Sequence, residues 1–269
     1  MPSVFRFSTR RFLIAAVLYA HAVATIALEP GAAYHLVDLT HPYNEETVFW
    51  PTSPTRFELE TLAKGETEGG WYYSAYSVCT PEHGGTHLDA PVHFHEDGKA
   101  TDELPLHNLV APAVVIDVSK QAAKDRDYRL TVADVGDFES RHGRIEAGTI
   151  VLLRTGWSRH WPNAKKYLGD DTPGDASKLS FPSFGLKAAT LLVEERGVVL
   201  LGVDTASIDY GRSQDFPVHR MAGARDVAGL ENLTNLDALP TTGILLLALP
   251  MKIEGGSGGP ARVVALIPE

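Results

Sequence analysis

Residues 82–94 of this 269-residue chain read EHGGTHLDAPVHF, and three potential metal ligands lie within this run. His83, His87 and Asp89 offer imidazole and carboxylate, the donors that zinc and manganese bind in proteins. The two glycines between the histidines permit a tight turn, which would bring His83 back towards His87. The run therefore predicts a metal site. A group of surface or structural histidines is the alternative interpretation.

His93 follows at the same parity as His87 and Asp89. Alternate side chains of an extended backbone point to one side, so these three would face one direction. Pro91 lies within the run and favours an edge or irregular strand. His93 is thus expected near the candidate ligands without being an obvious ligand itself.

The composition excludes several classes of protein. The chain has 44% hydrophobic residues and a formal net charge of −10. An acidic chain repels nucleic acid and anionic membranes, so neither is an expected partner. The single cysteine, Cys79, excludes an intrachain disulfide and a cysteine-rich zinc module. It lies in an apolar run and is expected to be buried. Any metal must therefore be held by His, Asp and Glu.

The N-terminus has the pattern of a secretory signal peptide over residues 1–28. A basic start that includes Arg10 and Arg11 precedes the apolar run Phe12–Ala20, and small residues suited to cleavage follow. The paired arginines also fit a twin-arginine signal. An ordinary Sec signal or an uncleaved anchor is the alternative. We expect a periplasmic or secreted protein consisting of residues 29–269, without stable membrane association after cleavage.

The remaining chain predicts one strand-rich α/β domain. One helix is expected after Thr131, ending near Gly143, and another after Ser183, ending at Gly197. Apolar and β-branched runs between turn residues predict strands, several of them buried on both faces. These runs are Leu36–Leu39, Phe57–Leu62, Tyr72–Val78, Val114–Val118, Ile150–Arg154, Val198–Val203, Ile244–Leu249 and Val263–Ile267.

Residues 83–94 match the H-x-G-T-H-x-D-x-P-x-H-F motif of the cyclase family, which includes bacterial kynurenine formamidases and isatin hydrolases. The chain resembles this family from about Tyr34 to its C-terminus. The resemblance implies a strand-rich α/β domain with a mixed sheet and flanking helices, commonly assembled as a homodimer or tetramer. It also implies a metal-dependent amidohydrolase, which cleaves an amide C–N bond of a small aryl amide or lactam with metal-activated water.

The resemblance extends to a second pair of ligands and a catalytic histidine. His219 and Glu231 have the twelve-residue spacing of the ligands that complete a two-metal site in kynurenine formamidases. The segment 202–209 resembles the strand-end segment that precedes them in the family. The implied cofactor is a divalent metal, zinc or manganese, with one or two ions per subunit. His93 matches the family's general base and acid, with a role as a further ligand as the alternative.

Aromatic residues near the motif are candidates for substrate binding. Trp50, Trp71 and Tyr72 would stack on a flat substrate if they lie over the metal. Core or dimer packing is their alternative role. Arg212 and Arg225 either bind a substrate carboxylate or are surface charges. The expected substrates are the lactam of isatin or the formamide of N-formylkynurenine.

Other functions remain open at this point. The same metal site suits a lactonase, cyclase or dehydratase, and a periplasmic small-molecule-binding protein is the non-enzyme alternative. A spare histidine beside three ligands favours catalysis. The Gly-x-Ser-x-Gly pattern at Gly255–Gly259 has no signal of a base nearby, so a serine hydrolase is not expected. Residues 255–259, which read GGSGG, are interpreted as a loop between the last two strands.

Overall fold

The first and last strands of the described residues share one sheet. The computed structural model describes residues 33–269, so the expected signal peptide at residues 1–28 lies outside the described residues. The strands of this sheet are β1 (Tyr34–Asp38), β4 (His87–Asp89), β5 (Val110–Asp117), β7 (Ile150–Arg154), β9 (Leu200–Val203), β10 (Ala228–Glu231), β11 (Ile244–Pro250) and β12 (Gly258–Pro268).

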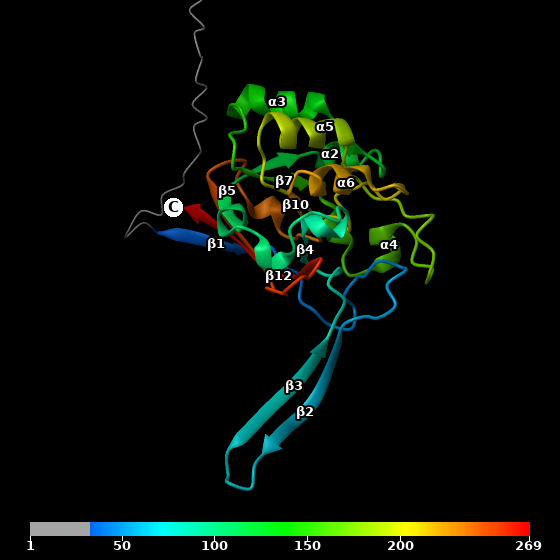
Figure 1. Ribbon diagram of the computed structural model, residues 1–269, viewed down its shortest axis with the longest axis vertical. Helices are drawn as coiled ribbons and strands as arrows, with labels where there is room; N and C mark the ends of the chain where they lie inside the picture. Colours follow the sequence, from blue (N-terminus) through cyan, green and yellow to red (C-terminus); the bar gives the residue numbers. More distant parts are fainter. Residues whose placement is uncertain (1–32) are drawn as a thin grey trace, which may run out of the picture.

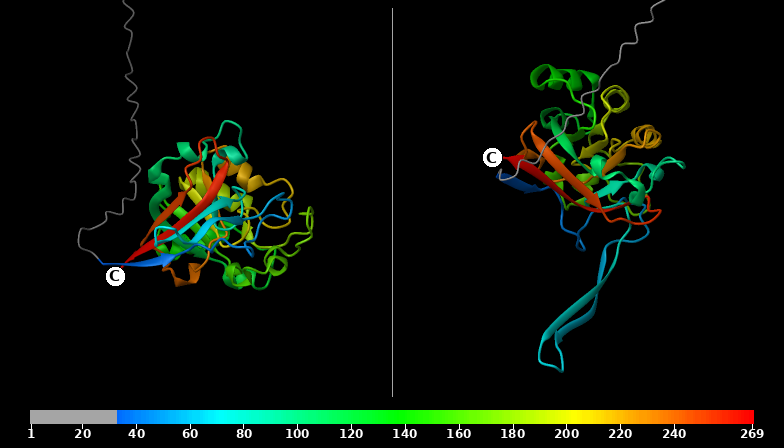
Figure 2. Two further views of the ribbon diagram at one scale, coloured as in Figure 1. Left: turned by 90° about the horizontal axis from the view of Figure 1, so that it is seen from below. Right: turned by 60° about the vertical axis from the view of Figure 1, so that its left-hand side comes forward.

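The sheet closes on itself. Its strand order is β1-β12-β11-β5-β7-β9-β10-β4, and β4 pairs a second time, with β12. This second pairing joins β4 through β12 into a barrel-like ring. Strand β1 lies outside the ring beside β12, as the blue and red strands in Figure 2 show. Pairs β5–β7, β7–β9 and β9–β10 are parallel and the others antiparallel, so the sheet is mixed as expected.

The central parallel strands are buried on both faces, as their uninterrupted apolar runs predict. Along β7, Ile150 and Leu152 pack inside the ring, whereas Val151 and Leu153 pack towards the helices. Figure 1 shows α3 and α5 lying over this outer face. The helices are α1 (Leu106–Leu109), α2 (Ser119–Ala122), α3 (Val132–His142), α4 (Ala164–Leu168), α5 (Leu186–Thr190) and α6 (Pro217–Gly223). Within residues 33–269, none is long and apolar enough to cross a membrane.

Helix α3 confirms the first predicted helix. The Thr131 hydroxyl accepts from the backbone N–H of Asp134, and the Asp134 carboxylate accepts from the N–H of Thr131. This reciprocal cap satisfies two N–H groups that would otherwise lack partners. Gly143 ends the helix at a φ of 88°, a conformation that glycine adopts without strain.

The second predicted helix has a different start. Ser183 does not cap it, because Ser183 lies in β8 (Ser183–Phe184) and its hydroxyl donates to the carbonyl of Ser207. Strand β8 pairs with β6 (Arg129–Leu130). Helix α5 begins after Gly185 and continues as the π-helix Leu191–Glu195, close to the predicted end.

Strands β2 (Glu58–Glu66) and β3 (Tyr72–Cys79) form a hairpin that extends away from the barrel, here called the arm (Figure 1). Both strands were expected. Large apolar side chains are exposed along the arm, namely Leu59, Leu62, Trp71, Tyr72, Tyr73, Tyr76 and Val78. Cys79 is exposed too, so its predicted burial is wrong. An apolar run normally indicates burial, but here it lies on a hairpin that stands apart from the barrel.

A buried histidine outside the site makes stability depend on pH. His41 stacks on Trp161 with ring centroids 4.1 Å apart, and burial lowers the pKa of His41 to about 4. The unfolded chain binds a proton on this histidine below about pH 6.5, whereas the folded chain does not until about pH 4. Its contribution to stability is therefore present above pH 6.5 and lost as the pH falls towards 4.

We expect His41→Phe to reduce this acid sensitivity, because phenylalanine keeps the stacked ring and has no proton to bind. Between pH 7 and 4.5, wild type should lose about 2 kcal/mol more unfolding free energy than the variant. Urea unfolding at both pH values measures the difference. His35→Phe, on exposed β1, is the control and should keep the wild-type pH dependence. Equal losses in His41→Phe and wild type would contradict the prediction.

Candidate metal centre and active site

The site forms where the short strand β4 lies between β10 and β12. His87 and Asp89 project from the same face of β4, and the register places Glu231 of β10 directly opposite His87. Pairing with Pro260 of β12 covers the other edge of β4. Of the two expectations, an edge strand is wrong, because β4 is paired on both sides. The expected irregularity is confirmed, because the strand ends at Asp89 and a 3₁₀ helix begins at Pro91.

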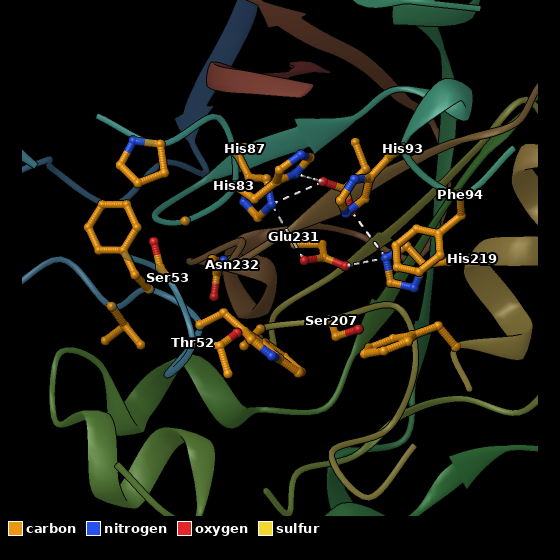
Figure 3. Close-up of a pocket in the computed structure, with 18 of the residues that line it drawn as sticks. Thr52, Ser53, His83, His87, His93, Phe94, Ser207, His219, Glu231 and Asn232 are labelled. Atoms are coloured by element: carbon orange, nitrogen blue, oxygen red, sulfur yellow. Dashed lines mark hydrogen bonds and ion pairs between the residues drawn. The ribbon is translucent and has the colours of Figure 1, made fainter. Parts of the chain in front are cut away.

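The other predicted site residues arrive from loops and helices. His83 lies in the turn before β4, and His93 ends the 3₁₀ helix Pro91–His93. His219 lies on α6. His93 reaches the site from this helix and not, as the parity argument assumed, from the strand itself. Figure 3 shows the side chains that point towards a common centre, namely His83, His87, His93, His219 and Glu231.

The Asp89 carboxylate lies between two groups of potential ligands. Its Oδ1 is 2.6 Å from Nδ1 of His83 and 3.1 Å from Nε2 of His87. Its Oδ2 is 3.1 Å from Nε2 of His219, and that nitrogen is 3.1 Å from Oε1 of Glu231. The structure thus brings all five predicted ligands together, with Asp89 shared by the two groups.

The cluster is buried and strongly attracts positive charge. Burial by itself would lower the pKa of His87, but Asp89 and Glu231 outweigh it and raise the pKa to about 9. Burial and the nearby Asp89 charge raise the pKa of Glu231. Burial opposes ionisation of Asp89, yet His87 and His83 hold the pKa of Asp89 well below its usual value. Protonated histidines therefore balance the buried carboxylates when only protons are present.

The residues present fit a divalent metal. In each group, the ligand atoms lie within 4.8 Å of one another. The set contains only imidazole nitrogens and carboxylate oxygens, which suits zinc or manganese. A cation would replace the protons that otherwise balance the carboxylates, so a metal satisfies the same electrostatic need.

His93 faces the same centre but belongs to neither ligand group. Its ring stacks on His83, with centroids 3.8 Å apart and planes 19° apart. Burial lowers the pKa of His93 to about 4. The ring is therefore neutral at pH 7 and has a free nitrogen lone pair. A neutral imidazole can accept a proton or bind a metal, and the position of His93 outside both ligand groups favours the proton acceptor.

Asp209 orients His219, a role that the sequence did not reveal. Its Oδ2 accepts from Nδ1 of His219 at 2.8 Å and from the His219 backbone N–H at 3.0 Å, while Oδ1 accepts from the N–H of Val218 at 3.0 Å. With the proton on Nδ1, Nε2 is left free to face Asp89 and Glu231. Asp209 does lie in the segment 202–209 that resembled the family, which was the only signal available.

We expect Asp209→Asn to weaken metal binding about 10- to 100-fold, because such carboxylates fix the tautomer of a ligating histidine and raise its basicity. Calorimetric titration of chelator-treated protein with Mn²⁺ or Zn²⁺ measures the change. Asp226→Asn, just beyond α6 and paired with Lys99, is the matched control and should bind metal normally. Equal affinities for Asp209→Asn and wild type would contradict this role.

A cavity of about 430 Å³ opens onto the ligand groups. Apolar and aromatic side chains form much of its wall, including Phe94 and Phe216, whose ring centroids are 5.2 Å apart. Trp50, a predicted substrate residue, also lines the cavity, and its ring centroid lies 6.1 Å from that of Phe216. Among the described residues that line it, none is lysine or arginine. Beyond the ligand groups, the polar lining residues are Thr52, Ser53, His93, Ser207 and Asn232.

The structure does not bring Trp71 and Tyr72 to the cavity of their own chain. Both lie on the arm, 63% and 65% exposed, and neither lines the cavity. The expectation placed them close to the metal because they precede the motif in sequence, but the arm carries them away from it. Phe94 and Phe216 instead supply aromatic wall near the ligands, and the sequence analysis did not assign them this role.

Comparisons with known proteins agree with this geometry. Residues 37–210 match the Cyclase family model, described as "Putative cyclase". An isatin hydrolase of Roseibium aggregatum is 34% identical over 219 residues, covering 80% of this chain and 82% of that protein. A kynurenine formamidase of Salinibacter ruber is 29% identical over 229 residues, covering 85% of this chain and 96% of that protein.

A solved structure shares the fold as well. Isatin hydrolase A from Ralstonia solanacearum superposes with a TM-score of 0.77 at 37% identity, covering 87% of this chain and 92% of that chain. The family match covers more than half of the chain, and the relatives are matched over most of their length. This chain therefore belongs to the cyclase family of metal-dependent hydrolases.

Proposed function

We propose that this protein hydrolyses the amide C–N bond of a small aryl amide or lactam, with isatin as the model substrate. One observation carries the proposal. Asp89 is shared by two groups of metal ligands, and His93 and an aromatic cavity face the same centre. The similarity to isatin hydrolases and kynurenine formamidases supports the same class of reaction.

The roles of the side chains follow from their positions. A divalent metal, if held by the two ligand groups, would supply a Lewis acid for activating water and for stabilising charge on the carbonyl oxygen. His93, neutral at pH 7, accepts the proton that the attacking water loses. It then donates this proton to the departing nitrogen, so that water is added across the C–N bond and His93 returns to its starting state. The Phe94 and Phe216 rings contact the flat part of the substrate.

The charge of the cavity favours a neutral substrate over an amino acid. N-formylkynurenine carries a carboxylate on its amino-acid group, and a carboxylate is usually bound by arginine or lysine. Neither residue occurs among the described lining residues. Arg212 pairs with Asp127, and Arg225 pairs with Glu194, both away from the cavity. A neutral lactam such as isatin therefore suits this site better than N-formylkynurenine.

The experiment compares the two substrates on one preparation. Residues 29–269 are stripped with chelator and loaded with Mn²⁺ or Zn²⁺, and hydrolysis is followed by absorbance. We expect metal-dependent turnover, with kcat/KM for isatin at least about tenfold above that for N-formylkynurenine. The reverse preference would refute the neutral-substrate argument. Binding of metal without turnover of either would favour lactonase, cyclase or dehydratase chemistry, or a small-molecule-binding protein.

Metal identity and number are part of the proposal. The mixed nitrogen and oxygen ligands suit both zinc and manganese. We propose one or two ions per chain, with two supported by the second group around His219 and Glu231. Metal content measured by mass spectrometry after loading would give about two ions for wild type. Loss of one ion in His219→Ala would assign the second position.

Location and assembly also remain proposals. The pattern at residues 1–28 supports export to the periplasm or the medium, which fractionation of cells expressing the full chain tests. We further propose a homo-oligomer, supported by the apolar side chains exposed on the arm. An isolated two-stranded hairpin is only marginally stable, so a contact with a second chain would stabilise it. Replacing residues 60–77 with a short turn should then lower the mass seen by light scattering.

A further inference from the structure

The glycine-rich segment 255–259, interpreted above as a connecting loop, lies against the metal ligands. Its last two residues are not loop but begin β12 and pair with β4. Its carbonyl at Ser257 accepts from the N–H of Ala90, which directly follows β4. The Ser257 hydroxyl lies 3.0 Å from Nε2 of His83, and it donates to Oε2 of Glu82 at 2.5 Å. The Ser257 backbone N–H donates to the same Glu82 oxygen at 3.2 Å.

The direction of these hydrogen bonds fixes the tautomer of His83. An ionised carboxylate only accepts, so the Ser257 hydroxyl must give its proton to Glu82. The hydroxyl oxygen is then left to accept from His83, which requires the proton on Nε2. Nδ1 of His83 therefore presents a lone pair to Asp89 Oδ1, 2.6 Å away. Two facing lone pairs repel each other at this distance, and a cation bound to both atoms would remove the repulsion.

His83 needs this support more than its neighbours do. Its side chain is 27% exposed, whereas those of His87 and Asp89 are 3% and 5% exposed. Surrounding atoms therefore hold it less firmly. At Gly258, the first residue of β12, a Cβ would lie only 2.5 Å from Cε1 of His83. Glycine at this position therefore leaves room for the His83 ring beside the backbone.

We propose that Glu82 and Ser257 are positioning residues, which hold His83 with Nδ1 aimed at the metal position. His83 stacks on His93, so the same pair also sets the plane of the proposed general base. This inference rests on the proposed metal site. It assigns to the glycine-rich loop a function in metal binding, beyond connecting β11 to β12.

The test compares variants of the loop by calorimetric titration of chelator-treated protein with Mn²⁺ and Zn²⁺. We expect Ser257→Ala to weaken metal binding at least about tenfold, as loss of such partners does at other metal sites. Ser257→Thr keeps the hydroxyl and should restore most of the affinity. Lys252→Ala, exposed on the same loop, is the matched control and should match wild type. Circular dichroism confirms that each variant is folded.

A second readout separates orientation from general loop stability. Nitrogen-15 NMR of zinc-loaded protein reports the tautomer of each histidine, and His83→Gln assigns the His83 signals. Wild type should carry the proton on Nε2 of His83, and Ser257→Ala should shift it towards Nδ1. Glu82→Ala should resemble Ser257→Ala, and the double variant should bind metal about as weakly as either single variant, because the two residues act as one unit.

The possible results distinguish failure of the positioning role from failure of the metal site. Metal affinity of Ser257→Ala within twofold of wild type would overturn the proposal. Weaker binding without rescue by threonine, and with the tautomer of His83 unchanged, would also overturn it, because the serine would then only stabilise the loop. If wild type binds neither ion, the proposed metal site fails first. Wild-type binding with no effect of Ser257→Ala refutes only the positioning role.

Discussion

Asp89→Asn is expected to abolish metal-dependent hydrolysis almost completely. The substitution keeps the size of the side chain but removes the negative charge that both ligand groups share. Because one carboxylate serves both groups, its loss weakens both positions at once. We expect kcat/KM to fall at least about 10³-fold, since the reaction depends on the Lewis acid held there. Metal content after loading should fall together with the rate.

The controls separate this effect from unfolding. Asp38→Asn removes an exposed carboxylate that pairs with Arg262, and it should leave both rate and metal content unchanged. Asp209→Asn, which removes a carboxylate that orients a ligand, should cause a smaller loss than Asp89→Asn. Full activity of folded Asp89→Asn would show that the reaction does not use this carboxylate.

His93→Gln should produce the opposite combination, a slow enzyme that binds metal normally. His93 lies outside both ligand groups, so metal affinity should stay within about threefold of wild type. Loss of a general base typically costs about 10²- to 10⁴-fold. We expect this loss in kcat, with a smaller change in KM, because glutamine still occupies the wall of the cavity. Steady-state kinetics and calorimetry on the same preparation measure the two effects.

The result for His93→Gln also tests the alternative role of this residue. If His93 were a metal ligand, metal affinity and kcat would fall together. Addition of excess metal would then restore part of the rate. A rate that stays low at saturating metal agrees with a base, whereas recovery with excess metal would assign His93 to the ligands.

The sequence predicted the parts of the site that depend on local spacing. His83, His87 and Asp89 lie in one short run, and a turn and a three-residue strand are enough to bring them together. The long central strands were also predictable, because burial on both faces leaves an uninterrupted apolar run. The extended backbone of β4 was predicted, but its pairing on both sides was not. Strand β10 was not predicted, because its four residues, AGLE, form no apolar run.

Contacts between distant segments could not be predicted from spacing alone. His219 and Glu231 were found only through resemblance to a family, because closure of the barrel brings β10 beside β4. Ser257 was interpreted as part of a connecting loop, since nothing near it in sequence indicated that His83 lies 3.0 Å away. Trp71 was misplaced for the opposite reason. It is close to the motif in sequence, but the arm separates it from the site in space.

The most direct test of the account is a titration of activity with metal. Protein stripped with chelator is treated with increasing amounts of Mn²⁺ or Zn²⁺, and hydrolysis of isatin is measured at each step. The account predicts negligible turnover without metal and a rise that saturates after one or two equivalents per chain. Full turnover of isatin by the stripped protein, with its metal content verified as negligible, would contradict the central claim.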